Sequence, residues 1–380
     1  MGSIYGVIVM SFFIFWIAVH HAGGYIVELT ITMAPFIWHA REMLFGYTIA
    51  IIAGFFLTAV PNWTETAPVR WPMLMLLVAT WLAGRIAVGF SAYLPPIAVA
   101  IVDLAMLPLL AFLVASAMFQ KFSKRNFVFL PILAVLFASN LFFHLEVLEV
   151  MADGIAIGLK LALGTIILLI TIIGGRVVPA FTTNALRSMG ETHLPINIMP
   201  LNIASIGLVA ALLIADLVDH EHMVTGMIAL AAAVANGLRL AFWKGHKVLA
   251  QPIIWVLHLG FAWLVIGLAL KALAILHPDL GPQTALHALT AGAIGTMTLA
   301  VMSRAALGHT GRELSVNKWM VLAYILVSLG AVLRLIVPAL LPSYYNEGML
   351  LAGIAWTAAL AVFSVVYWPI LTGPSLSNKA

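Results

Sequence analysis

The stretch from Trp38 to Trp63, WHAREMLFGYTIAIIAGFFLTAVPNW, decides the fold class. It opens with polar residues and continues with an apolar run of about 20 residues, the length that an α-helix needs to cross a bilayer. One face of this helix carries residues at helical spacing: His39, Glu42, Met43, Gly46, Ala50 and Ala53. We therefore expect a spanning helix with an imidazole and a carboxylate at its mouth and only small residues beyond them. A flat group or another helix can pack closely against such a face.

A second stretch, HALTAGAIGTMTLAVMSRAALGHTGR from His287 to Arg312, has the same plan. It also opens with His-Ala at the mouth of a helix of membrane length, and Thr290, Ala291 and Thr298 follow on the histidine's face. Two histidines from distant parts of the chain are therefore expected at equivalent positions on two spanning helices.

The composition excludes a soluble globular protein. Of the 380 residues, 63% are hydrophobic and only 8% are charged, whereas a soluble domain carries about a quarter charged residues. The chain has no Cys, so disulfides, thiolate nucleophiles, iron–sulfur clusters and Cys-ligated haem are excluded. The net charge of +4 is typical of cytoplasmic loops of a membrane protein and does not indicate nucleic-acid binding.

Hydropathy predicts an all-α, polytopic membrane bundle of about 12 transmembrane helices. Short connections join the helices, so we expect a single integral membrane domain over residues 1–380. The expected spans are 4–24, 40–60, 71–90, 95–118, 127–143, 154–178, 198–217, 222–242, 252–272, 285–306, 317–339 and 347–370.

The charge distribution orients this bundle, because cytoplasmic loops of membrane proteins are enriched in Lys and Arg. Basic residues follow the even-numbered spans: Arg70, Lys121, Lys124, Arg125, Arg176, Arg187, Arg239, Lys244, Lys247, Arg304, Arg312, Lys318 and Lys379. Acidic residues follow the odd-numbered spans: Glu28, Glu146, Glu149, Asp216, Asp219, Glu221, Asp279 and Glu347. We therefore expect both termini on the cytoplasmic side.

This orientation gathers polar residues in the outer half of the bundle. His39, His144 and His287 fall near the outer face, and His258 is expected near mid-membrane. Five basic residues project into the outer half of the spans: Arg41, Arg85, Lys160, Lys271 and Arg334. Charged residues within a membrane usually face the bundle interior and mark a functional pathway or a paired site.

Five blocks of the sequence resemble the NnrS family of bacterial membrane proteins. They are WHAREM, GFFLTAVPNW, GGRVVPAFTTNALR (174–187), LHLGFAWLVIGLAL (257–270) and HALTAGAIGTMTLAVMSRAALGHTGREL. The resemblance implies a haem- and copper-containing protein of the bacterial inner membrane that is linked to the response to nitric oxide. One departure is that the family often has a second histidine where this chain has Arg41, so this turn carries one histidine, His39.

Haem b is the cofactor that the resemblance implies, and imidazole is its commonest protein ligand. His39 and His287 are the first expected pair, because both stand one residue into a span from the same face. His258 and His144 are expected next, as metal ligands of a second haem or of a copper ion. The alternative for each is a hydrogen-bonding role, at a helix mouth or, for His258, within the core.

Four charged residues are candidates for supporting roles at the haem. Arg85, Lys160 and Arg334 are expected to bind the propionates through charge-assisted hydrogen bonds. Alternatively, these basic residues simply pair with Asp103 and Glu42. Glu42 is the candidate catalytic proton donor on the basis of its position alone.

Two functions remain open at this point. The first is an oxidoreductase of the nitric oxide reductase type, or a haem protein that binds nitric oxide without turnover; its partners are nitric oxide, an unknown electron donor and membrane lipid, with no nucleic acid. The second is a haem-free secondary transporter with twelve spans and a polar outer vestibule. Both readings place a multi-pass protein in the bacterial inner membrane.

Overall fold

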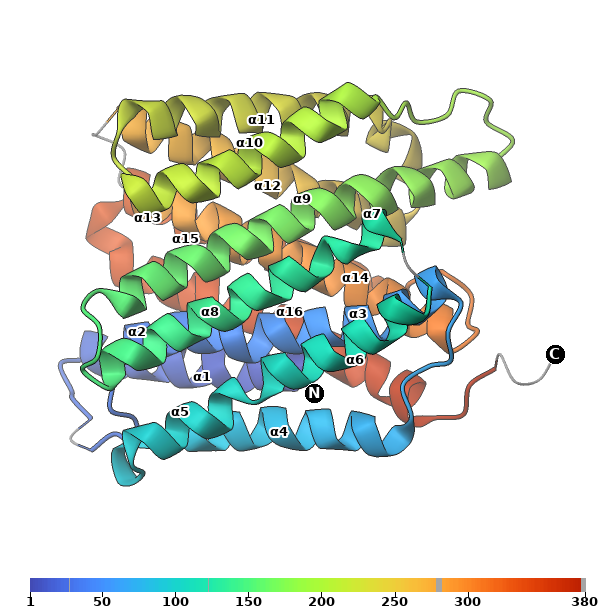
Figure 1. Ribbon diagram of the computed structural model, residues 1–380. Helices are drawn as coiled ribbons and strands as arrows, with labels where there is room; N and C mark the ends of the chain where they lie inside the picture. The colour runs from blue at the N-terminus through green and yellow to red at the C-terminus, as the bar shows by residue number, and fades with distance from the viewer. Residues whose placement is uncertain (27, 122, 278–281, 377–380) are drawn as a thin grey trace. The chain divides into compact units, whose positions relative to one another are not determined.

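The computed structural model describes the whole chain except residues 27, 122, 278–281 and 377–380 (Figure 1). Asp279 and Lys379, which contribute to the predicted charge asymmetry, therefore lie outside the described residues. All regular secondary structure in the described part of the chain is helical, which confirms the all-α class.

Twelve helical segments in the described residues are long and apolar enough to cross a bilayer, as predicted. They are Gly2–His21, Pro35–Thr64, Trp71–Gly89, Pro96–Gln120, Phe129–Val147, Gly154–Ser188, Met199–Val218, Met223–Phe242, Pro252–Leu276, Gln283–His309, Lys318–Leu340 and Pro342–Thr372. Each overlaps the predicted span of the same order. The orientation with both termini cytoplasmic stays a prediction.

The largest difference from the predicted spans is at α9 (Gly154–Ser188), which continues well beyond residue 178. The hydroxyls of Thr182 and Thr183 donate to the backbone carbonyls one turn earlier, at 2.8 Å each. These hydroxyl groups are satisfied by hydrogen bonds within the helix itself, so their polarity does not require the helix to end. The helix therefore runs through Pro179 and the polar sequence after it.

The contacts divide the chain into two compact units, Met1–Thr165 and Ile166–Ala380, and the division falls inside α9. The prediction of a single domain stays a prediction.

Unit 1 contains the first eight α-helices and the start of α9. Its elements are α1 (Gly2–His21), α2 (Pro35–Arg41), η1 (Glu42–Thr48), α3 (Ile49–Thr64), α4 (Trp71–Gly89), η2 (Ser91–Tyr93), α5 (Pro96–Leu104), α6 (Met106–Gln120), α7 (Lys124–Phe127) and α8 (Phe129–Val147). Helix α1 packs on η1, α4 packs on α5, and α6 packs on α3 and α8. Gly154 and Gly158 bring α9 against the backbone of α8, since a Cβ at either would lie within 2.4 Å of a carbonyl oxygen of that helix.

Unit 2 contains the rest of α9 and the C-terminal helices. Its further elements are α10 (Met199–Val218), α11 (Met223–Phe242), η3 (Gly245–Val248), α12 (Pro252–Leu276), α13 (Pro282–His287), η4 (Ala288–Ile294), α14 (Gly295–His309), α15 (Lys318–Leu340), η5 (Pro342–Tyr344) and α16 (Tyr345–Thr372). Helix α12 lies at its centre, because it packs on α11, η4 and α14. Gly260 and Gly267 of α12 permit this approach, since a Cβ at either would meet Met297 or Leu289 at 3.0 Å or less.

Two segments, η1 and η4, are seven-residue π-helices, and they follow the two histidines singled out from the sequence. A π-helix bonds residue i to i+5, and single π turns inside α-helices are frequent at functional sites. A tryptophan from a neighbouring helix donates to a carbonyl in each: Trp81 to Gly46 at 3.0 Å, and Trp356 to Ala291 at 3.2 Å. The wide turns interrupt the 3.6-residue period, so the continuous face predicted from His39 onward is broken.

Candidate functional site

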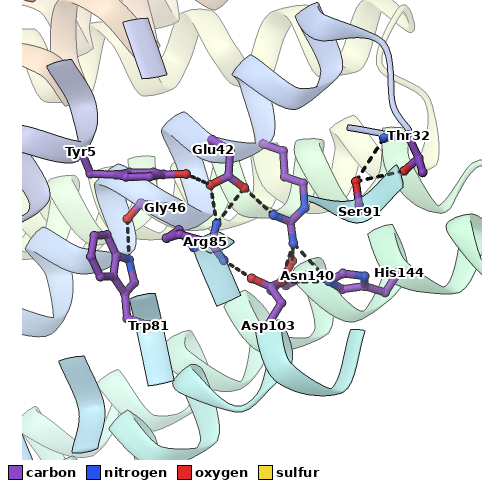
Figure 2. Close-up of polar contacts among 11 residues, drawn as sticks. Tyr5, Thr32, Glu42, Gly46, Trp81, Arg85, Ser91, Asp103, Asn140 and His144 are labelled. Carbon is purple, nitrogen blue, oxygen red and sulfur yellow. Dashed lines mark hydrogen bonds and ion pairs between the residues drawn. The ribbon is translucent and has the colours of Figure 1, made fainter. Parts of the chain in front are cut away.

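Four charged side chains lie together in the interior of unit 1 (Figure 2). Arg41 ends α2, Glu42 begins η1, Arg85 comes from α4 and Asp103 from α5. Their exposed fractions are 0%, 0%, 7% and 3%, so water does not solvate their charges. We call these residues, together with Tyr5, Asn140 and His144, the ion network.

At one end of the ion network, Glu42 receives hydrogen bonds from three side chains. The phenol of Tyr5 donates to its Oε2. Arg41 Nη1 donates to Oε1 at 2.5 Å, and Arg85 Nη1 lies 2.7 Å from both oxygens. Every one of these partners is a donor, so Glu42 acts only as an acceptor and has no proton to give in this arrangement. The geometry favours a charge-pairing role for Glu42, and its catalytic role stays a prediction.

At the other end, Asp103 joins three helices. Its Oδ1 accepts from Arg85 Nη2, and its Oδ2 accepts from Arg41 Nη2 and, at 2.7 Å, from Asn140 Nδ2. Both Nη atoms of Arg85 are thus bound to carboxylates. The structure shows the pairing of Arg85 with Asp103 and Glu42 that was the alternative to a propionate contact.

His144, in α8, belongs to the same ion network. Its Nε2 lies 2.8 Å from Asp103 Oδ2 and 3.1 Å from Arg41 Nη2. This nitrogen either donates to the carboxylate or accepts from the guanidinium, depending on the tautomer. Because Nε2 is engaged in either case, we assign His144 to the ion network and leave it out of the ligand set proposed below.

The ion network balances its charges, with two guanidinium groups facing two carboxylates. Removing charges from water costs several kcal/mol per ion, and close pairing with further hydrogen bonds offsets that cost. Glycines make the approach possible: a Cβ at Gly46 would lie 2.5 Å from Tyr5, and one at Gly84 would lie 3.1 Å from the Asp103 Cα. The sequence therefore builds a buried, electrically neutral polar core in unit 1.

His39 lies in α2, half-buried, with its ring stacked on Phe13 of α1. The two ring centres are 4.1 Å apart and the planes differ by 5°. Phe13 also stacks on Trp16, which in turn contacts His20. One face of the His39 imidazole is therefore covered by an aromatic ring, and this contact fixes the ring plane.

His287 is the last residue of α13 and is half-buried in unit 2. Its Nδ1 lies 2.8 Å from the backbone carbonyl of Gln283. Helix α13, which ends at His287, packs on α15, which carries Arg334. The structure thus brings together the two helices that carry one predicted haem ligand and one predicted propionate partner.

His258 lies in the second turn of α12, and its position near mid-membrane stays a prediction. Its Nε2 is 2.8 Å from the hydroxyl of Thr182, and its buried Nδ1 has no hydrogen-bond partner in the described part of the chain. A Cβ at Gly245 would lie 2.6 Å from that Nδ1. The imidazole is enclosed on both nitrogens, which favours the core role over metal ligation.

The proposed first ligand pair is divided between the units, His39 in unit 1 and His287 in unit 2. Their meeting at one iron stays a prediction. The part of the chain that the structure describes contains no group of three His, Asp or Glu side chains arranged to hold a metal ion. A copper site likewise stays a prediction.

Sequence reasoning missed Tyr5 and Asn140 as members of the ion network. Asn140 stands four residues before His144, so helical spacing places both on one face of α8, and that signal was available. Tyr5 lies in an apolar run with no polar neighbour at helical spacing that would distinguish it from an interfacial tyrosine.

The fold and these sites define a multi-pass, all-helical membrane protein with a buried ion network and, in unit 2, a half-buried histidine whose ring is oriented by a backbone carbonyl. The chain belongs to the NnrS family: the family model described as NnrS protein matches residues 1–375, which confirms the resemblance. No curated protein matches the chain. Family membership supports a membrane protein of the nitric oxide response.

Proposed function

We propose that the protein binds haem b through His287 and detoxifies nitric oxide in the bacterial inner membrane. One observation carries this proposal: in unit 2, the oriented imidazole of His287 ends a helix that packs on α15, whose Arg334 forms no ion pair with a described residue. The arrangement supplies both kinds of group that hold a haem, a ligand for the iron and a cation for a propionate.

The orientation of His287 fits a metal ligand. Metal-binding histidines usually donate the second ring N–H to a carbonyl or carboxylate, which fixes the tautomer. Here the carbonyl of Gln283 accepts from Nδ1, which leaves the lone pair on Nε2. Among the described residues Nε2 has no hydrogen-bond partner, so it is the atom that would bind iron.

The surroundings of Arg334 fit a propionate partner. Its guanidinium lies over the ring of Tyr345, 5.9 Å from the ring centre, and does not face a carboxylate of the described residues. A half-buried cation without a counter-charge is costly within a membrane. A haem propionate would neutralise Arg334, whereas Arg85 already has two carboxylates and needs no further anion.

His39 is the proposed second ligand, on the strength of its half-buried position before a π-helix and its stacking on Phe13. Haem iron supplies the binding of nitric oxide and the exchange of electrons. The protein's part is to hold the iron, to neutralise the propionates and to keep the site apolar. Reduction of nitric oxide then requires an electron donor, which is the further partner of this proposal.

Absorption spectroscopy of the purified protein tests the proposal. We expect a Soret band and reducible α bands in the wild type, loss or shift of these bands in His287→Ala, and weaker haem retention in Arg334→Gln. His246→Ala, at an exposed histidine of unit 2, is the matched control and should leave the spectrum unchanged.

Two outcomes would contradict this function. A folded wild-type protein that stays colourless after haem is supplied would favour the transporter alternative. A full haem complement with an identical spectrum in His287→Ala would show that another residue binds the iron.

A further inference from the structure

Arg239 is a buried arginine of unit 2, three residues before the end of α11, and it is 3% exposed. It forms no ion pair with a described residue, whereas Lys247 and Lys271 of the same unit pair with Glu191 and Asp216. An arginine cannot lose its proton inside a protein, so it must be balanced in another way. The two buried arginines of the ion network show the usual solution, which is a carboxylate.

The hydrogen bonds of Arg239 satisfy only part of its donor set. Nε donates to Asn202 Oδ1 at 2.9 Å, and Nη1 donates to Asn236 Oδ1 at 3.1 Å and to the carbonyl of Thr171 at 3.3 Å. Every acceptor is neutral. A guanidinium carries five N–H groups, so the two on Nη2 have no acceptor among the described residues.

Two aromatic rings and a glycine lie around the Arg239 guanidinium and its two unmatched N–H groups. The rings of Trp243 and Phe261 lie 5.4 and 5.7 Å from the guanidinium carbon and bring apolar surface against the group. Nη2 lies against Gly175 of α9, where a Cβ would stand 1.6 Å from it. Glycine at this position is therefore required for the guanidinium to reach its place, and the unmatched charge is held there by packing.

The end of unit 2 that carries Arg239 is strongly basic. The segment 189–198 is tied to this end, because Ile196 N donates to the Phe242 carbonyl at 3.1 Å and Lys247 Nζ lies 2.6 Å from Glu191 Oε2. Asn202, which binds Arg239, also donates to Asn197 of the same segment. The basic residues in or near this segment and η3 along the chain are Arg187, His193, Lys244, His246 and Lys247, of which Lys247 is paired with Glu191. Such a cluster raises the local concentration of anions.

We propose that unit 2 holds a binding site for a small inorganic monoanion at Nη2 of Arg239. The anion supplies the missing counter-charge and accepts from the two unmatched N–H groups, and Asn202 and Asn236 hold the guanidinium in position. A small anion fits the chemistry because the groups around the guanidinium are aromatic rings, neutral amides and a glycine, none of which supplies a counter-charge. The site is independent of the haem proposed above.

Thermal unfolding of the full-length protein in an uncharged maltoside detergent tests this site. The probe is sodium nitrate, compared with sodium gluconate at equal ionic strength, since gluconate is too bulky for an enclosed site. Binding to the folded state alone raises the unfolding midpoint in a saturable way. We expect nitrate to do so in the wild type, and at least a tenfold higher half-saturating concentration in Arg239→Gln.

Arg304→Gln is the matched control, because Arg304 is another arginine of unit 2 that lies over an aromatic ring, 3.8 Å from that of Phe181. It should keep the wild-type response. If Arg239→Gln does not fold, Gly175→Ala replaces it, since the added Cβ overlaps Nη2 and must weaken nitrate binding by a similar factor.

Three results would overturn the proposal. One is a wild type with no nitrate-specific shift, which would leave water as the partner of Nη2. Another is an undiminished nitrate response in both Arg239→Gln and Gly175→Ala. The third is a shift produced only by added phosphatidylglycerol, which would assign Nη2 to a lipid phosphate.

Discussion

Asp103 is the residue on which the ion network depends, because its two oxygens bind both buried arginines as well as Asn140. In Asp103→Asn the two guanidinium groups keep their charges and face only one carboxylate. Removing one partner of a buried ion pair typically costs about 3–5 kcal/mol. We therefore expect a large fall in the unfolding midpoint of the purified protein, measured by intrinsic fluorescence.

Glu65→Gln provides the comparison for Asp103→Asn. Glu65 pairs with Lys121 at the surface, where both side chains are more than half exposed, and exposed pairs contribute little. We expect its midpoint to stay close to that of the wild type. Equal destabilisation by the two substitutions would mean that water reaches the charges of the ion network and that these charges are not buried.

Glu191 gives a pH dependence outside the membrane-spanning helices. The hydrogen bond from Lys247, and then its charge, lower the pKa of Glu191 below the ordinary 4.5. A carboxyl whose pKa is depressed by folding contributes stability above its unfolded value and loses it as the pH falls through the folded value. We therefore expect the tie between segment 189–198 and η3 to weaken only below about pH 4.5.

Hydrogen exchange of the amides in segment 189–198 measures this tie, with Glu191→Gln as the reference at each pH. The variant should exchange faster than the wild type at neutral pH, and the difference should vanish in acid. A difference that persists unchanged at pH 3 would show that the carboxylate is not what holds the segment.

The partner of Arg85 could be predicted from the sequence only in part. The pairing of Arg85 with Glu42 and Asp103 was one of two predicted alternatives, because charges within a membrane must find partners. The sequence could not decide between a carboxylate and a propionate. That choice depends on Gly46 and Gly84, whose missing side chains let α1 approach η1 and α5 approach α4. Such distances are properties of the packed helices.

At the scale of the elements, Gly46 and Gly54 of the same span provide a matched pair. A Cβ at Gly46 would press on Tyr5 and on the Glu42 carboxylate, whereas a Cβ at Gly54 has nothing within 4 Å. We expect Gly46→Ala to destabilise the protein by about 1–3 kcal/mol, because overpacking forces side chains aside. Gly54→Ala should be neutral or slightly stabilising, since alanine favours the helix.

Thermal unfolding of the two glycine variants under identical conditions is the measurement. Equal midpoints would indicate that η1 relaxes easily and that its contact with α1 is loose. This comparison also tests the π-helix itself, since Gly46 is the residue whose carbonyl accepts from Trp81.

The spanning helices were predictable, whereas the π-helices were not. Apolar runs of sufficient length specify a spanning helix almost alone, because no other single segment satisfies its backbone in lipid. In the π turn of η4, the Ala291 carbonyl accepts a hydrogen bond from Trp356, which is distant in sequence. No local sequence pattern predicts such a partner.

At the scale of the whole molecule, the absence of Cys makes the orientation directly testable. Asp219→Cys is predicted to lie outside and Arg187→Cys inside, since these positions follow an odd- and an even-numbered span. Both residues are exposed. In intact cells, a membrane-impermeant maleimide should label the first variant and not the second, and both should react after the membrane is opened.

The reverse labelling pattern would invert the predicted orientation, and labelling of both positions in intact cells would contradict the alternation of the twelve spans. The unsubstituted protein is the blank for this experiment, because it offers no thiol to the reagent.

The ion network also constrains how the nascent chain can enter the bilayer. Arg41 and Glu42 are adjacent and cancel each other within one segment, but α4 emerges with the unpaired charge of Arg85. Glu42 is already shared with Arg41, so the further partner of Arg85 is Asp103 on α5, the next α-helix to be synthesised. A lone charge at a helix centre costs about 2.5–3.5 kcal/mol on insertion, so release of α4 and α5 from the translocon as a joined hairpin avoids exposing either ion to lipid.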